Sequence, residues 1–173
     1  MLFVLAPCVR AADGYPQTIV ASAKVVSGAT TVTSKVTITV NRLVEPSRRD
    51  RVINGLKANG YQGFMDALRP LPVIGSIATQ STEVKVRYAW ESEVEGKKRL
   101  IVVSDKPLFF LAGDASKAKA GFELTFVELV FDGKGGATGT MAGAARVKPV
   151  PPDGIALQDY AAEPVQLTVP AAK

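Results

Sequence analysis

Histidine is absent from this chain of 173 residues, and its only cysteine is Cys8, close to the start. Histidine is the commonest general base near neutral pH, and a cysteine thiolate is both a nucleophile and a zinc ligand. If the first residues are removed after synthesis, the remaining chain has neither side chain. The composition therefore disfavours chemistry that needs an imidazole or a thiol, and it favours a protein that is not an enzyme. No cofactor and no metal ion are expected.

Long apolar runs are also lacking, because none approaches the ~20 residues that a membrane helix needs. A short one stands at the start, over Met1–Val9, and Arg10 and small residues follow it. An apolar run before small residues is typical of the back half of a secretory signal. Val9 and Ala11 fit a small-residue cleavage site. We therefore expect a signal peptide over residues 1–11, which directs the protein to the periplasm or the outside of a bacterium.

The basic segment that opens such signals is missing, which indicates either a true start upstream of the given one or an atypical leader. Two alternatives remain open. The run Leu5-Ala6-Pro7-Cys8 resembles a bacterial lipoprotein site, at which Cys8 would carry a lipid and anchor the protein to the envelope membrane. Pro7 fits such a site poorly. The other alternative is the first β-strand of a cytosolic protein.

Charge of one sign is not concentrated in this chain. Removing residues 1–11 leaves 162 residues and lowers the formal net charge from +5 to +4, because Arg10 is the only charged residue lost. The densest basic run, Arg48-Arg49-Asp50-Arg51, is interpreted as the solvated start of a helix. Without interleaved aromatics or a known motif, nucleic-acid binding is not expected. The length suits one domain, over residues 12–173, which buries about two-thirds of its unfolded surface.

Alternation with a period of two, rich in β-branched residues, dominates the chain and predicts half-buried strands. Glycine-containing turns are expected at 27–29 and 133–136, a bulge near Val127-Glu128, and a proline-rich crossing over 147–152. The strands are expected at 18–26, 31–40, 74–79, 83–91, 99–104, 122–132, 137–147 and 164–169. In the clearest of them, one face is expected to carry Val84, Val86, Tyr88 and Trp90.

A helical pattern interrupts the strands over residues 47–69. Ser47 is expected to cap the first helix, with Asp50 three residues on as in a capping box. Asn59-Gly60 supplies a left-handed stop before a second short helix. The fold class is therefore mainly β, with α+β as the alternative: about eight antiparallel strands in a sandwich or a partly closed barrel, carrying a helical hairpin.

Aromatic residues make up 7% of the chain and are the weak candidates for a ligand site. If the sheet closes, they are expected to converge on its interior, where a barrel of about eight strands can hold one small molecule. A purely structural core role is the stronger interpretation. The candidates are Tyr88, Trp90, Phe109, Phe110, Phe122 and Phe126.

Carboxylates offer the remaining chemistry. Glu91, Glu93 and Glu95 would share one face of a strand and supply the oxygen ligands that calcium prefers, but they lead into a turn, where charged residues usually face water. The trio Ser104-Asp105-Lys106 is compact, yet adjacent strand residues point to opposite faces. Asp105 is expected instead to cap its own backbone at the strand end. No catalytic residue is assigned.

Six segments of the chain form a familiar combination: 50–60, 67–69, 87–89, 98–107, 126–129 and 158–167. Together they resemble a group of uncharacterised secreted bacterial proteins, over most of the chain. The resemblance implies secretion and one compact domain, and it implies no activity or site residue.

The sequence thus predicts an exported envelope protein that acts as a non-catalytic binding or structural module, with an envelope protein or a small apolar ligand as its partner. A lipocalin-like carrier of a small apolar ligand is the first alternative. A hydrolase that uses two carboxylates is the second, because such a pair can act as acid and base. Contact with a membrane is expected only if Cys8 is lipidated.

Overall fold

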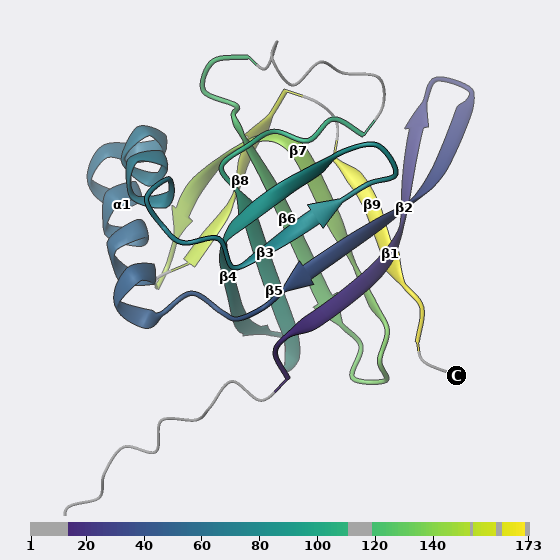
Figure 1. Ribbon diagram of the computed structural model, residues 1–173, viewed down its shortest axis with the longest axis horizontal. Helices are drawn as coiled ribbons and strands as arrows, with labels where there is room; N and C mark the ends of the chain where they lie inside the picture. Colours follow the sequence, from purple (N-terminus) through teal and green to yellow (C-terminus); the bar gives the residue numbers. More distant parts are fainter. Residues whose placement is uncertain (1–13, 111–118, 153, 162–163, 172–173) are drawn as a thin grey trace, which may run out of the picture.

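The computed structural model describes residues 14–110, 119–152, 154–161 and 164–171. It is mainly β, with nine antiparallel strands in one sheet and one helical element packed outside it (Figure 1). The strands are β1 Gln17–Ser27, β2 Thr30–Val40, β3 Gly75–Ala78, β4 Glu83–Val94, β5 Lys97–Ser104, β6 Leu124–Phe131, β7 Ala137–Val150, β8 Gly154–Tyr160 and β9 Val165–Val169; the helical element is α1 Pro46–Leu68.

The sheet curls round until it closes partly into a ring. Its strand order is β6-β5-β4-β3-β2-β1-β9-β7-β8, and β6 also pairs with β7. The seam between β1 and β9 is short, with three pairs from Ser22↔Thr168 to Lys24↔Gln166. The β1–β2 hairpin continues past this seam and projects from the ring (Figure 1). Of the two architectures expected from the sequence, the partly closed ring is the nearer.

Strands β8 and β9 lie along the same edge of β7. Ala145 of β7 pairs with Leu124 of β6 on one side and with Tyr160 of β8 on the other, so β8 occupies the edge that β9 uses further along. The expected proline-rich crossing over 147–152 is wrong: β7 runs on to Val150, and β8 returns beside it. Eight of the nine strands therefore form the ring, and β8 is the one that lies outside it.

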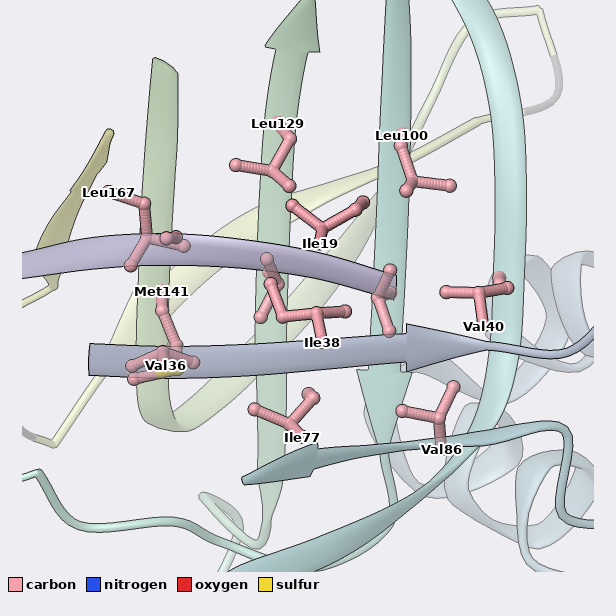
Figure 2. Close-up of a cluster of buried hydrophobic side chains, with 14 of the residues drawn as sticks. Ile19, Val36, Ile38, Val40, Ile77, Val86, Leu100, Leu129, Met141 and Leu167 are labelled. Atoms are coloured by element: carbon pink, nitrogen blue, oxygen red, sulfur yellow. The ribbon is translucent and has the colours of Figure 1, made fainter. Parts of the chain in front are cut away.

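The interior of the ring is aliphatic. Strands β1 to β7 and β9 all send apolar side chains inward, and these side chains pack against one another (Figure 2). Ile38, at the centre, has no exposed surface. The labelled members are Ile19, Val36, Ile38, Val40, Ile77, Val86, Leu100, Leu129, Met141 and Leu167. This packing gives no support to the carrier hypothesis.

A second apolar cluster lies outside the ring, between α1 and the outer face of β4 to β8. One apolar face of α1 is turned towards this sheet, and Phe64 and Leu68 are fully buried there. The members from α1 are Val52, Ile53, Leu56, Tyr61, Phe64, Met65 and Leu68. The central strands therefore carry apolar side chains on both faces, as the unbroken run Leu100-Ile101-Val102-Val103 predicts.

The helical element consists of two segments that meet at a kink at Asn59 and Gly60. Gly60 has φ +62°, the left-handed conformation that glycine adopts without steric cost. A Cβ added at Gly55 would come within 2.6 Å of the Gly63 carbonyl oxygen, so the two segments cross where both residues lack a side chain. The expected helical hairpin and its Asn59-Gly60 stop are confirmed.

The expected cap of the first helix is wrong. Glu45, not Ser47, is the N-cap residue, and Pro46 follows at the first helical position. Proline suits this position because its missing N–H would be unpaired in any case. No side chain caps the end by a hydrogen bond, but the Glu45 carboxylate pairs with Arg48 Nε at 3.0 Å.

Bulges set which residues face inward. In β4 the register shifts between Val86 and Tyr88, so Arg87 is an extra residue. Val84 and Val86 point into the ring, whereas Tyr88 and Trp90 point outward under α1. The expectation that these four side chains share a face is therefore wrong, because one inserted residue reverses the alternation beyond it.

The bulge expected near Val127-Glu128 lies elsewhere. The irregularity falls between Leu124 and Phe126 of β6, and the extra residue belongs to the partner strand β7. Strand β6 itself keeps a regular alternation, since Leu124 and Phe126 face outward while Val127 faces inward.

No helix among the described residues is long and apolar enough to span a membrane.

Candidate binding site at the mouth of the ring

One end of the ring is formed by the β4–β5 turn, the β6–β7 turn, the start of β1 and the end of β9; we call this end the mouth. Two open hollows lie here, of about 420 and 320 Å³. The larger is lined by Gln17, Gly96, Lys97, Lys98, Phe131, Asp132, Gly133 and Gly135. Lys97, Phe131 and Asp132 also line the smaller one, so the two hollows adjoin. Their volumes suit small organic molecules.

A polar network closes the aliphatic interior at this end. The Tyr15 hydroxyl donates a hydrogen bond to Glu91 Oε1 at 2.6 Å, and Lys98 Nζ lies 3.2 Å from the same oxygen. The Lys98 ammonium also stands 4.3 Å from the centroid of the Phe131 ring. Glu91 and Lys98 continue the inward-facing rows of Ala89 and Leu100 beyond the core. The network therefore links β4, β5 and β6 at the rim with the segment that precedes β1.

The network changes the chemistry of its tyrosine. Burial, the hydrogen bond to Glu91 and the charge of that carboxylate together raise the pKa of Tyr15 well above its ordinary value. The phenol therefore remains a hydrogen-bond donor throughout the physiological pH range. Tyr15 also packs against the apolar interior, while its hydroxyl is held by Glu91.

Asp132 and Lys97 differ in how their charges are compensated. Asp132 Oδ1 accepts hydrogen bonds from the backbone N–H groups of Lys134 at 2.7 Å and Gly136 at 3.0 Å, which shapes the β6–β7 turn. Lys97 is exposed, and within the described part of the chain it forms no ion pair. Lys97 and Phe131 line the same two hollows, so an ammonium and an aromatic ring are both available there for an anionic group attached to an apolar body.

The aromatic candidates do not converge on the interior of the ring, which corrects the expectation from the sequence. Tyr88 and Phe126 are buried in the outer cluster under α1, and Trp90 lies at its margin beneath the Arg49 guanidinium, 4.5 Å from the ring centroid. Phe122 is buried beside Tyr61 and Arg146. Phe109 is half-buried in the connection from β5 to β6.

Phe110 alone of these aromatics packs against the interior cluster, at its edge and only partly buried. Of the residues at the mouth, Glu91 was considered from the sequence only as a calcium ligand, and Tyr15, Lys97, Lys98 and Phe131 were not proposed for any site. The available signal was the small residue Ala89 in an otherwise polar row, because it indicates that this row turns inward.

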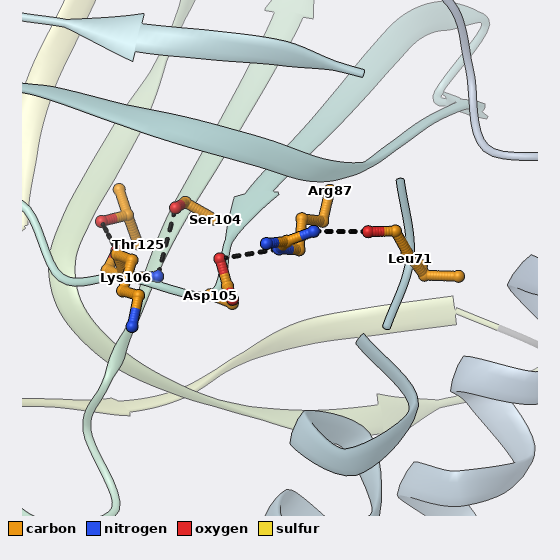
Figure 3. A network of polar contacts seen from close by, with 6 residues as sticks. All are labelled: Leu71, Arg87, Ser104, Asp105, Lys106 and Thr125. Atoms are coloured by element: carbon orange, nitrogen blue, oxygen red, sulfur yellow. Dashed lines mark hydrogen bonds and ion pairs between the residues drawn. The ribbon is translucent and has the colours of Figure 1, made fainter. Parts of the chain in front are cut away.

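Ser104, Asp105 and Lys106 lie in a network of polar contacts that joins the end of β5 to its neighbours (Figure 3). Ser104 Oγ accepts the Lys106 N–H at 3.2 Å, so the serine, not the aspartate, makes the expected turn bond to the backbone. Asp105 instead pairs with Arg87 Nε at 3.0 Å, and Arg87 Nη1 donates to the Leu71 carbonyl at 2.5 Å. Ser104 and Asp105 therefore bind different partners, as expected for adjacent strand residues that point to opposite faces.

Glu91 and Glu93 do share a face of β4, as expected, while Glu95 lies in the turn with φ 51°. Within the described ranges, no group of three acidic side chains is arranged to hold a metal ion. The hydrogen bond that Glu91 accepts from Tyr15 and its ion pair with Lys98 give this carboxylate a structural role at the mouth.

Cys8 and the expected signal peptide over residues 1–11 lie outside the described residues. The chain matches no protein-family model, no curated protein and no solved structure.

Proposed function

We propose that the protein is a non-catalytic binding module of the bacterial envelope and that the mouth of the ring is its binding site. The observation that carries the proposal is the pair of adjoining hollows, in which the Phe131 ring and the Lys97 ammonium stand together. The ligand that suits them is a small amphipathic anion. Its apolar part would lie on Phe131, and its charged group would face Lys97.

Rigidity of the rim supports this site. Tyr15, Glu91 and Lys98 join β4 and β5 to the segment before β1 beside the larger hollow, and Asp132 fixes the turn at its border. A preformed rim lowers the entropic cost of binding, because few side chains have to be ordered when the ligand arrives. Two features of the sequence support the envelope location: the expected apolar leader and the resemblance to secreted bacterial proteins.

Fluorescence titration of the full chain with anilinonaphthalene sulfonate, an amphipathic anion, tests the site. We expect saturable binding at one site, and at least about tenfold weaker binding in Lys97→Gln or Phe131→Ser, because an ion pair or an aromatic contact is lost. Lys148→Gln, at an exposed position of β7 away from the mouth, serves as the matched control. Equal affinity in all variants would show that the mouth is not the site.

Mass spectrometry of protein recovered from a bacterial host tests the envelope location. A chain that begins at Ala12 and is found in the periplasm or the medium supports export. A lipid on Cys8 would place the protein on the membrane instead and would correct the proposed processing. An uncut chain that remains in the cytoplasm would contradict the envelope role.

A further inference from the structure

A second cluster of charged and aromatic side chains lies away from the mouth, where α1, β7 and the segment leading into β6 meet. The Arg146 guanidinium of β7 stands over two rings, 5.2 Å from the centroid of Tyr61 and 5.6 Å from that of Phe122. Lys119 Nζ lies 5.0 Å from the same Phe122 ring. Two cations therefore share one aromatic platform, and we call Tyr61, Lys119, Phe122 and Arg146 the arginine platform.

Among the residues that the structure describes, Arg146 has no hydrogen-bond partner. Its Nε is shielded from solvent and donates no hydrogen bond, and the side chain forms no ion pair with any described residue. Arg87 and Arg99 differ, because each faces a carboxylate, Asp105 and Glu128 respectively. Stacking on aromatic rings holds a guanidinium in place without using its N–H groups. Arg146 is therefore oriented but not neutralised.

The acids beside the platform already have partners. Glu123 accepts a hydrogen bond from the Tyr61 hydroxyl at 2.7 Å. Burial alone would raise the pKa of Glu123, but this bond, backbone N–H groups and the charge of Arg69 lower it. Asp159, opposite Arg146 on β8, accepts the Tyr160 N–H at 2.8 Å. Three basic residues, Arg69, Lys119 and Arg146, lie here beside two acids, so the described side chains of this region carry one more positive charge than negative.

We propose that the arginine platform binds an oxyanion, either a carboxylate or a phosphate group, on the outside of the ring. A guanidinium presents a rigid fork of donors that matches both groups, and the rings fix the orientation of that fork before the anion arrives. Lys119, on the neighbouring segment, adds a second positive charge that can approach the same anion. This site does not depend on the ligand of the mouth.

Titration of the full chain with inorganic phosphate and, separately, with acetate tests this site, followed by isothermal calorimetry and by the chemical shifts of the backbone amides near Arg146. We expect saturable binding of at least one of the two anions. Arg146→Gln should weaken it at least about tenfold, because a charge-assisted hydrogen bond is lost. Arg146→Lys should weaken it less, since it keeps the charge but loses the fork. Saturation by one anion only identifies which group the platform takes.

Lys148→Gln is the matched control, because residue 148 lies two positions along the same strand, on the same side and exposed. Its affinity for the anion should remain that of the unmodified chain. Lys119→Gln keeps the test decisive if Arg146→Gln fails to fold, since residue 119 is exposed. Equal affinity in Lys119→Gln and the unmodified chain, or no saturable binding of either anion, would overturn the proposal. Lys97→Gln should leave phosphate binding unchanged, which separates this site from the mouth.

Discussion

Tyr61 and Glu123 form a closed pair of hydrogen bonds across the boundary between α1 and the sheet. The Tyr61 hydroxyl donates to Glu123 Oε2 at 2.7 Å and accepts the Glu123 backbone N–H at 2.9 Å. One hydroxyl therefore satisfies two groups that lie 62 positions further along the chain. This contact fixes the second helical segment against the entry into β6.

Removing this hydroxyl should destabilise the fold. Tyr61→Phe leaves the Glu123 N–H without an acceptor and its carboxylate without a donor, and we expect a loss of about 1–3 kcal/mol in the free energy of unfolding. Urea denaturation measures it. Tyr160→Phe is the control, because Tyr160 is 44% exposed, and its effect should stay within about 0.5 kcal/mol. Equal effects of the two substitutions would mean that the pair contributes nothing.

Alkaline pH should weaken the fold through buried phenols. Burial raises the pKa of Tyr88 from 10.0 to about 12, although the nearby Arg49 acts in the opposite direction. Between these values the unfolded chain releases a proton that the folded chain retains, so the free energy of unfolding falls as the pH rises. Tyr88→Phe should make this decline shallower in denaturation curves recorded across that range. An unchanged slope would contradict the assignment.

The junction of Arg87 and Asp105 should show strong coupling between the two side chains. Asp105 is 8% exposed, so Asp105→Asn leaves the Arg87 guanidinium with a weaker partner, and we expect a loss of about 1.5–3 kcal/mol. A double-mutant cycle with Arg87→Met isolates the coupling. Lys85→Gln breaks the exposed pair with Glu83 and should cost less than about 1 kcal/mol. Additive effects of Asp105→Asn and Arg87→Met would contradict the coupling.

Gly143 should tolerate no side chain. The Leu108 N–H donates to the Gly143 carbonyl at 2.8 Å, and a Cβ added at Gly143 would overlap the Leu108 carbonyl oxygen. We expect Gly143→Ala to cost about 1–3 kcal/mol or more, because backbone has to move. Gly154→Ala is the control, since its added Cβ meets first a Val150 methyl at 3.1 Å. Similar thermal melting of both variants would show that the segment after β5 is free to shift.

The alternation of apolar and polar residues predicted most of the strands, and the differences between prediction and structure have identifiable causes. Arg87 reverses the facing of Tyr88 and Trp90, yet an extra residue in a strand leaves no signal in hydrophobic alternation. Strand β8 was not predicted because Pro149, Pro151 and Pro152 indicated a crossing. Pro149 nevertheless fits inside β7, opposite Ile155, towards the end where the sheet ceases to be central.

The candidate site could not be predicted in the same way. Tyr15 lies 76 positions from Glu91, and their contact exists only because the sheet curls round. Local patterns report which way a side chain points, but they do not report which strand it will meet. Lys98 and Phe131 likewise become neighbours only through the pairing of β5 with β6. Sequence reasoning instead favoured the aromatic side chains, which the structure uses mainly under α1.

Strands β5 and β6 separate two apolar clusters, one inside the ring and one beneath α1. Val102 and Val103 are adjacent in the chain, yet Val102 packs in the cluster inside the ring and Val103 in the cluster beneath α1. If α1 detached, the apolar outer face of β5 and β6 would be exposed to water, and these strands of the ring would lose their packing against the helix. We therefore expect the helix and the ring to unfold together, so that a calorimetric trace contains one transition whose van't Hoff and calorimetric enthalpies agree.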